Sequence, residues 1–217
     1  MYKKYIKRFL DIIAALILII LFLPVWIIIP ILMKLEHYQY PLLYKPIRIG
    51  KNGKSFNLFK FRSMIMLEEK GKLVHAIGIW KKNKELFEKY KKSGWKLEIG
   101  NDPRITKLGK ILRQTSIDEM PQVFNILKGE MSLVGPRAYV QPEIDDAIKR
   151  HGKKIKPYIK KSLTVKPGLS GPWQVSGRNK IPWKDRVKMD AEYAKKLTFA
   201  KDIIIVLKTP LAMLSKW

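Results

Sequence analysis

A long uninterrupted apolar stretch constrains this 217-residue chain more than any other feature. From Ile12 to Met33 the only side chain able to form a hydrogen bond is the indole of Trp26. As an α-helix, these 22 residues would extend for about 33 Å, which is enough to cross the hydrocarbon core of a bilayer. A helix that is apolar all round needs lipid or a large protein core around it, and a chain of this length supplies little core. We therefore expect residues 1–36 to form a membrane segment.

Positive charge on both sides of the apolar stretch bears on its topology, because basic flanks favour the cytoplasmic side of a membrane. The flanking cations are Lys3, Lys4, Lys7 and Arg8 before the stretch, and Lys34, Lys45, Arg48, Lys51 and Lys54 after it. Pro24 lies near the middle, where it removes a backbone hydrogen bond and clashes with the preceding turn. We predict a re-entrant helix hairpin that bends at Leu23–Pro24, with a straight span and a buried helix as the alternatives.

The net charge of the chain narrows the choice of partner. There are 44 Lys and Arg against 18 Asp and Glu, a formal charge of +26, in a composition that is 47% hydrophobic and too apolar for a disordered basic tail. Nucleic acid, an anionic membrane surface and a phosphorylated substrate all suit such an excess. The absence of Cys excludes a thiolate zinc site and a cysteine nucleophile, and the three scattered His argue against a histidine metal site. Asp11 is expected to pair with Arg8, three residues earlier.

The remainder of the chain predicts a mixed α/β domain without repeats. Glycine, proline, periodicity and short apolar runs are the signals used. They indicate a β-hairpin within Tyr40–Phe61, a basic amphipathic helix within Ile79–Leu97, a helix over Ser116–Lys128, a strand over Met131–Val134, a helix over Trp183–Leu197, and a core or interfacial helix over Ile203–Met213.

Two adjacent carboxylates, Asp118 and Glu119, form the most suggestive local feature. One interpretation is structural: Ser116 and Glu119 have the spacing of a helix capping box, and acids suit the positive end of a helix dipole. The other is chemical: a helix N-terminus and Arg113 would keep Asp118 ionised and bind negative charge beside it, as a carboxylate that attacks a phosphate requires. Because adjacent helical residues diverge in direction, the two acids would have separate roles.

Two turns carry arginines. Gly135-Pro136-Arg137 follows a short apolar run, and its backbone N–H groups and guanidinium could cradle a phosphate, although a purely structural turn is the alternative. Arg178 lies on a second turn, near Trp173, whose ring could stack on a base or a sugar. The sequence contains no P-loop, no dinucleotide-binding glycine motif and no serine-hydrolase elbow, which argues against those three chemistries.

Seven segments along the chain together form an ordered set. They are Lys7–Asp11, Phe59–Met64, Asn101–Thr106, Leu112–Gln122, Leu127–Arg137, Lys166–Gly171 and Trp173–Asn179. In sequence and in order, this set resembles the bacterial sugar transferase family, the monotopic polyprenol-phosphate phosphoglycosyl transferases. The resemblance covers nearly the whole chain.

The resemblance implies transfer of a sugar-1-phosphate from a UDP-sugar to undecaprenyl phosphate, with release of UMP, in a ping-pong exchange. The implied setting is the cytoplasmic face of the bacterial inner membrane, in the first membrane step of exopolysaccharide, O-antigen, capsule or glycoprotein glycan assembly. The implied fold is a membrane-associated α/β protein: a re-entrant hydrophobic helix hairpin in residues 1–36, then a small cytoplasmic catalytic domain in residues 37–217 with interfacial amphipathic helices. The stretch from His75 to Gly100 looks more like members that handle hexoses such as galactose or glucose.

The resemblance also assigns roles to residues. Asp118 would be the nucleophile that forms a covalent phosphosugar intermediate, and Glu119 would assist the lipid phosphate or help Asp118 to hold Mg²⁺. Phosphate or substrate binding would fall to Arg113, Gly135, Pro136, Arg137 and Lys166, nucleotide-sugar binding to Arg178, and polyprenol-phosphate binding to Lys60 and Arg62.

Two positions depart from the family pattern. Leu23 precedes Pro24 where many members carry Ser, and Lys166 stands where many have Arg. The rival to an enzyme is a membrane-tethered polybasic scaffold that binds lipid or nucleic acid without catalysis. Because no nucleic-acid-binding motif is present, the expected partners are a UDP-sugar, undecaprenyl phosphate and membrane lipid. Whether the protein forms a homodimer is left open.

Overall fold

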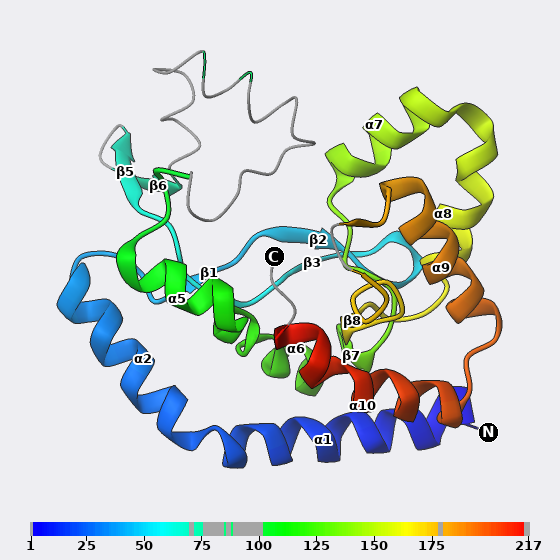
Figure 1. The fold of residues 1–217 in the computed structure, drawn as a ribbon, viewed down its shortest axis with the longest axis horizontal. Helices are drawn as coiled ribbons and strands as arrows, with labels where there is room; N and C mark the ends of the chain where they lie inside the picture. Colours follow the sequence, from blue (N-terminus) through cyan, green and yellow to red (C-terminus); the bar gives the residue numbers. More distant parts are fainter. Residues whose placement is uncertain are drawn as a thin grey trace. The chain divides into compact units, whose positions relative to one another are not determined.

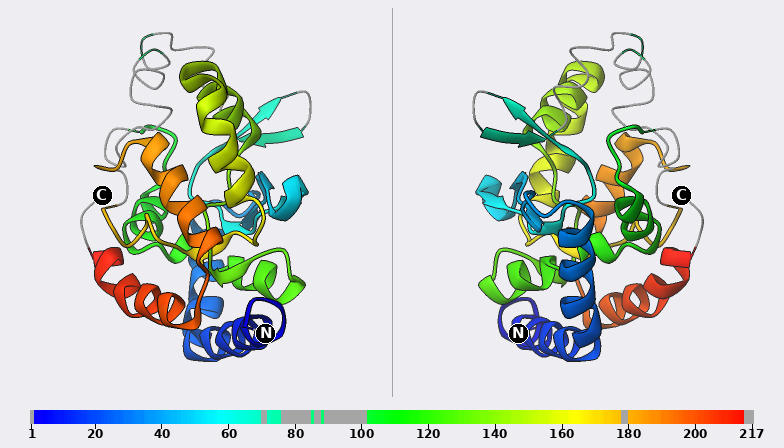
Figure 2. Two further views of the ribbon diagram at one scale, coloured as in Figure 1. Left: turned by 90° about the vertical axis from the view of Figure 1, so that its right-hand side faces the viewer. Right: turned by 90° about the vertical axis from the view of Figure 1, so that its left-hand side faces the viewer.

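The computed structural model describes residues 2–69, 72–75, 85, 88, 102–177 and 180–214. The chain divides into two compact units. The first unit consists of Met1–Leu23, Lys45–Lys60 and Pro121–Lys216, and the second of Pro24–Tyr44 and Phe61–Met120. Helices and strands occur in both units (Figures 1 and 2), so the predicted mixed α/β class is confirmed. Apart from Glu85 and Glu88, the amphipathic helix predicted within Ile79–Leu97 lies outside the described residues.

The apolar stretch forms two helices. A π-helical turn (Tyr2–Ile6) leads into α1 (Lys7–Leu21), and α2 (Leu23–Glu36) follows after a break of 62° at Phe22. Pro24 lies in the first turn of α2, where its ring and missing N–H prevent the helix from continuing unbroken. No single described helix is long and apolar enough to cross a bilayer. Taken together as a bent pair, α1 and α2 have the length and apolar composition that a crossing requires.

The second unit is built around α2 and α5 (Lys107–Thr115), a helix that the sequence did not predict. β1 (Leu43–Tyr44) pairs with β4 (Lys60–Phe61), and β5 (Met66–Glu69) forms an antiparallel hairpin with β6 (Lys72–His75). The core of this unit packs apolar side chains of α2 and α5 around one aromatic ring. Its buried members are Ile29, Met33, Phe61 and Leu112.

The first unit contains the predicted β-hairpin. β2 (Ile47–Ile49) pairs antiparallel with β3 (Ser55–Asn57), with Arg48 opposite Phe56. The connecting 3-10 turn (Lys51–Gly53) places Asn52 and Gly53 at positive φ, 57° and 76°. Such angles favour Gly and Asn, which explains why the glycine-rich turn signal was reliable here.

A parallel pair of strands and a group of helices complete the first unit. β7 (Ser132–Val134) pairs with β8 (Gly168–Ser170), so the predicted strand over Met131–Val134 is confirmed. The helical elements are α6 (Gln122–Lys128), α7 (Gln141–His151), a 3-10 turn (Gly152–Ile155), α8 (Lys156–Ser162), α9 (Trp183–Lys195) and α10 (Phe199–Leu214). α9 and α10 confirm the two helices predicted near the C-terminus.

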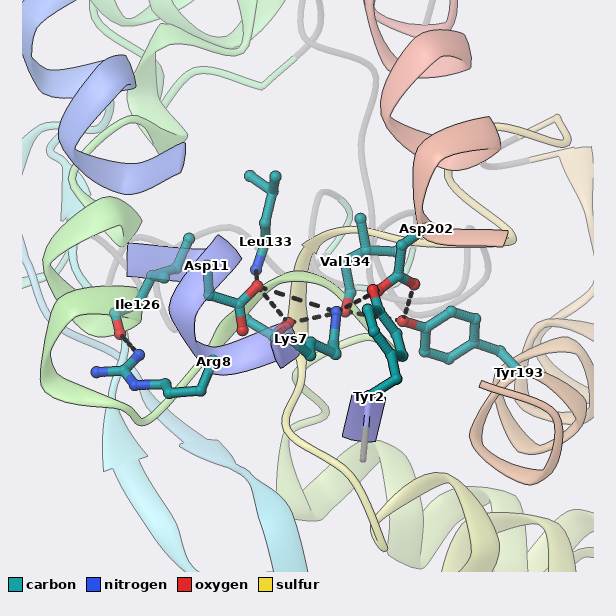
Figure 3. A network of polar contacts seen from close by, with 10 residues as sticks. Tyr2, Lys7, Arg8, Asp11, Ile126, Leu133, Val134, Tyr193 and Asp202 are labelled. Atoms are coloured by element: carbon teal, nitrogen blue, oxygen red, sulfur yellow. Dashed lines mark hydrogen bonds and ion pairs between the residues drawn. The ribbon is translucent and has the colours of Figure 1, made fainter. Parts of the chain in front are cut away.

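The basic start of α1 is folded into the first unit rather than directed to solvent (Figure 3). Lys7 Nζ lies 2.6 Å from Asp202 Oδ2, and that carboxylate also accepts hydrogen bonds of 2.5 Å from the hydroxyls of Tyr2 and Tyr193. The Lys7 and Asp202 side chains are only 11% and 8% exposed. A buried ion pair of this kind depends on its additional hydrogen bonds, which here come from two tyrosines.

Two further residues at the start of α1 join this polar network. Asp11 accepts from the Ser132 hydroxyl and the Leu133 N–H, both at 2.9 Å. Arg8 donates to the carbonyls of Ile126 and Leu127 at the end of α6, where helix carbonyls lack partners within the helix. The predicted Arg8–Asp11 pair is therefore wrong: the cation nearest to Asp11 is Lys7, at 3.9 Å.

The Lys7–Asp202 pair makes a testable contribution to stability. Lys7→Met should leave a buried carboxylate without its cation and lower the free energy of unfolding by about 3 kcal/mol. Thermal unfolding in detergent would measure this as a large drop in Tm. The matched control is Arg150→Met, because the Arg150–Asp146 pair is 59% and 41% exposed and should contribute only about 0.5 kcal/mol. Equal effects of the two substitutions would contradict a stabilising role for the buried pair.

Candidate active site

Asp118 and Glu119 occupy a tight turn between two helices. The turn is a 3-10 helix (Ile117–Glu119), and α6 begins only at Gln122. Ser116 ends α5 in the left-handed conformation, φ 59°, and its carbonyl accepts the Glu119 N–H at 3.1 Å. The predicted continuous helix over Ser116–Lys128 and the Ser116 capping box are therefore wrong, since the Ser116 side chain caps no helix. Ser116 and Glu119 have the spacing of a capping box. The left-handed conformation of Ser116, however, changes the direction of its side chain.

Arg113 provides the positive charge near Asp118. Asp118 is 8% exposed, and Arg113 Nε donates to the Ser63 hydroxyl at 2.8 Å. Burial lowers the pKa of Arg113, while the Asp118 carboxylate acts in the opposite direction. The predicted association of Arg113 with Asp118 is thus present within the second unit. A guanidinium anchored by a hydroxyl can stabilise the carboxylate and still carry charge for a phosphate.

A glycine allows Ser63 to reach Arg113. A Cβ atom on Gly109 would lie 2.1 Å from the Ser63 carbonyl oxygen, so the two backbones approach too closely for any other residue. The Thr106 N–H donates to the same carbonyl at 3.2 Å, and the Thr106 hydroxyl accepts the Gly109 N–H at 2.9 Å as the helix cap. The start of α5 and the Ser63 segment are consequently fixed to one another, which sets the position of the Arg113 partner.

Lys60 and Arg62, the predicted contacts to polyprenol phosphate, occupy different environments. Arg62 is 2% exposed, donates to the Met33 carbonyl at 3.3 Å and lies over the Tyr40 ring at 4.9 Å. Burial lowers its pKa. Lys60 is half-buried on β4. Their proposed contact with lipid phosphate stays a prediction.

The first unit brings together two glycine-containing turns that lie far apart in the sequence. The Gly135 N–H donates to the Ser170 carbonyl at 2.9 Å, and the Gly168 N–H donates to the Pro136 carbonyl at 2.8 Å. A Cβ atom on Gly168 would lie 2.0 Å from the Gly135 nitrogen. Both glycines are therefore required by the close approach of the β7 and β8 ends. The predicted phosphate turn is built from two strand ends, not from one loop.

Asp190 of α9 fixes the backbone at Arg137. Its fully buried carboxylate accepts the Arg137 N–H at 3.0 Å and the Tyr139 hydroxyl at 2.5 Å. Burial raises the pKa of Asp190 to about 7, partly offset by these hydrogen bonds. The Arg137 side chain pairs with Glu143 at 3.4 Å. Sequence analysis missed Asp190, although an acid three residues after Val187 on the buried stripe of α9 was an available signal.

Lys166 and Arg178 complete the set of predicted phosphate ligands. Lys166 is half-buried, and its ammonium lies near the left-handed Gly129 at the end of α6, where Arg8 also lies. Burial and the charge of Arg8 lower the pKa of Lys166, with Asp11 acting against them. Arg178 lies outside the described residues. Trp173 is 5% exposed, and the stacking of its ring on a base or a sugar stays a prediction.

The carboxylates suit the predicted metal ion. The described part of the chain contains no cluster of three or more His, Asp or Glu side chains that could hold a metal. Mg²⁺ rarely needs such a cluster, because one or two carboxylates, substrate phosphates and water usually complete its coordination. The adjacent oxygen donors of Asp118 and Glu119 fit this pattern.

Comparison with known sequences identifies the family. The sequence profile of the bacterial sugar transferase family matches residues 2–216. The chain belongs to this family. Similar proteins are an uncharacterized sugar transferase of Haemophilus influenzae (38% identity, 99% of this chain, 42% of the relative), an undecaprenyl-phosphate galactose phosphotransferase of Salmonella typhimurium (36%, 99%, 41%) and the exopolysaccharide production protein ExoY of Rhizobium meliloti (36%, 97%, 86%). The chain thus spans about two fifths of the first two relatives and most of the third.

The raised pKa of Asp190 predicts a pH dependence of stability. The folded transferase holds this proton more tightly than the unfolded chain, so ionisation at higher pH costs the folded state free energy. Tm should therefore fall as pH rises from about 4 to about 7 and level off above that. Asp190→Asn removes the titrating proton and should flatten this decline. The exposed Asp146→Asn on α7 should preserve it, and identical slopes for all three proteins would contradict the assignment.

Proposed function

We propose that this bacterial sugar transferase moves a hexose-1-phosphate, such as that of galactose or glucose, from a UDP-sugar to undecaprenyl phosphate and releases UMP. The observation that supports it most directly is the buried Asp118 carboxylate in a rigid turn beside the anchored Arg113. Among the relatives, the Salmonella protein is named an undecaprenyl-phosphate galactose phosphotransferase, and the Rhizobium protein is named for exopolysaccharide production. The product would enter the assembly of a polysaccharide or glycan.

The proposed reaction has two steps. In the first, an Asp118 oxygen attacks the phosphorus that bears the sugar, the bond from that phosphorus to the bridging oxygen breaks, and UMP leaves. In the second, an oxygen of undecaprenyl phosphate attacks the same phosphorus and the Asp118 carboxylate leaves, which gives the lipid diphosphate sugar. A covalent intermediate suits two substrates that differ in solubility, because each can visit the site in turn.

The attack of a carboxylate on a diphosphate meets charge repulsion, which the protein must reduce. Arg113 and Arg137 would bind phosphate oxygens and lower the potential that the nucleophile meets. Bound Mg²⁺, held by Asp118 and Glu119, would supply further neutralisation of phosphate charge. The short turn that holds Asp118 limits its motion, so little reorganisation would precede the attack.

We also propose that α1 and α2 form a re-entrant membrane segment at the cytoplasmic face. In a straight span, Lys7 and Glu36 would lie on opposite sides of the bilayer. Lys7 is paired with Asp202, and Glu36 accepts the Leu108 N–H at 3.0 Å. The sequence between Leu108 and Asp202 has no apolar stretch of the roughly 18 residues that could return across the membrane. These contacts favour both helix ends on one side.

The nucleophile assignment predicts the behaviour of Asp118→Asn. The amide cannot form the acyl phosphate, so UMP release from UDP-sugars, with undecaprenyl phosphate and Mg²⁺ in detergent, should fall by at least about 1,000-fold. The radiolabelled phosphosugar adduct of the parent protein should also disappear. The control is Asp146→Asn, an exposed carboxylate on α7 that should retain parental activity.

The outcomes of this assay separate the hypotheses. An Asp118→Asn protein with parental turnover would contradict the assignment of Asp118 as nucleophile but would still support transferase activity. A folded parent that released UMP from no common UDP-sugar would instead favour the polybasic scaffold.

Thiol labelling tests the re-entrant topology, and the natural chain offers no competing Cys. Tyr5→Cys and Tyr38→Cys introduce exposed thiols before α1 and after α2. Both should resist a membrane-impermeant reagent in intact cells and react in inverted membranes, as should the control Asn52→Cys at the exposed hairpin tip. Labelling of Tyr5→Cys and Tyr38→Cys from opposite sides would show a straight span.

A further inference from the structure

Trp173 lies close to two guanidinium groups in the first unit. Its ring centroid is 5.5 Å from the central guanidinium carbon of Arg137 and 4.9 Å from that of Arg186. Arg137 follows β7 and Trp173 follows β8, and the carboxyl ends of paired parallel strands meet at one edge. Arg186 comes from α9, one helical turn before Asp190. Sequence analysis assigned no role to Arg186.

The grouping of donors is electrostatically unusual. Burial lowers the pKa of Arg186, and the neighbouring charge of Arg137 lowers it further. Glu143 offers one carboxylate to this pair of cations, through a 3.4 Å contact with Arg137. Two cations held close together in half-buried surroundings favour the binding of an additional anion.

The indole of Trp173 provides an independent sign of a ligand. The side chain is only 5% exposed, and its Nε1 has no hydrogen-bond partner among the described residues. A buried N–H donor without an acceptor costs free energy, which a bound acceptor would recover. The indole N–H lacks an acceptor and lies near two positive charges, so an anionic oxygen suits it better than a neutral ligand.

We propose that Arg186 and Trp173, together with Arg137, form a binding site for a phosphate group of a substrate. The inference rests on the proposed transfer reaction, in which both the UDP-sugar and undecaprenyl phosphate carry such groups. Arg137 and Arg186 bind the phosphate oxygens through charge-assisted hydrogen bonds, and the indole N–H of Trp173 supplies a neutral donor. The ring also holds both guanidiniums by cation–π attraction, which keeps the two like charges in place before the phosphate arrives.

Asp190 and Glu143 set the limits of this site. Asp190 accepts the backbone N–H of Arg137 and so orients the turn. Glu143 is 30% exposed and contacts Arg137 at the long distance of 3.4 Å, so a phosphate with two charges can displace it. The site therefore carries positive charge, its backbone is held by Asp190, and a phosphate can replace the weak Glu143 contact with Arg137.

The test is the variant Arg186→Gln, measured in full kinetics with the holoprotein and Mg²⁺. Loss of one charge-assisted contact should raise a KM about tenfold and leave kcat within about twofold. A raised KM for the UDP-sugar assigns the site to the nucleotide diphosphate, and a raised KM for undecaprenyl phosphate assigns it to the lipid phosphate. Arg186→Lys should recover part of the affinity because it restores the charge without the bidentate geometry. Arg150→Gln on α7 is the matched control and should change neither KM.

A binding measurement keeps the inference independent of turnover. Inorganic pyrophosphate, UDP and UMP should raise the Tm of the parent protein, and Arg186→Gln and Trp173→Phe should both reduce that increase. Trp173→Phe keeps an aromatic six-membered ring but removes the pyrrole ring together with its N–H donor. The site would be overturned if Arg186→Gln showed the same ligand-induced rise in Tm and the same two KM values as the parent. A parent that binds pyrophosphate through Arg186 but releases no UMP would uphold the site and refute the proposed reaction.

Discussion

The buried contact between Lys7 and Asp202 is the interaction on which most of the first unit depends. Lys7 is the first residue of α1 and Asp202 lies in the first turn of α10, so one ion pair joins the two ends of the chain. Tyr2 and Tyr193 satisfy the same carboxylate, and desolvation and the Asp202 charge raise the pKa of both hydroxyls, so they remain donors. The first residue of the apolar helix α1 is thereby part of the folded core.

The same end of α1 connects to β7 and β8. Asp11 holds the backbone and side chain at the start of β7, and the glycines at the ends of β7 and β8 allow their turns to touch. Asp190 then fixes the turn from the side of α9. The backbone position of Arg137 thus depends on contacts supplied by α1, β8 and α9, none of which is a neighbour in sequence.

Elements with local signals could be predicted from the sequence. The Gly50–Gly53 turn requires positive φ, and the Trp183–Lys195 helix has its own periodicity, so both were predicted correctly. The partners of Lys7 and Asp11 could not be predicted, because they lie 195 and 121 residues away. The Arg8–Asp11 pair was inferred from spacing, and tertiary contacts with more favourable geometry replaced it. Distant polar pairing is not encoded in local patterns.

The turn at Asp118 shows how an error in local structure changes the electrostatic argument. A helix N-terminus would have stabilised the Asp118 carboxylate with its dipole, but a single 3-10 turn has few aligned peptides and a correspondingly small dipole. The positive charge must come chiefly from Arg113, whose position depends on Ser63, and Ser63 reaches it only because Gly109 has no side chain. Arg113 thus supplies positive charge beside Asp118, and the fit of a glycine against a backbone carbonyl determines where that arginine lies.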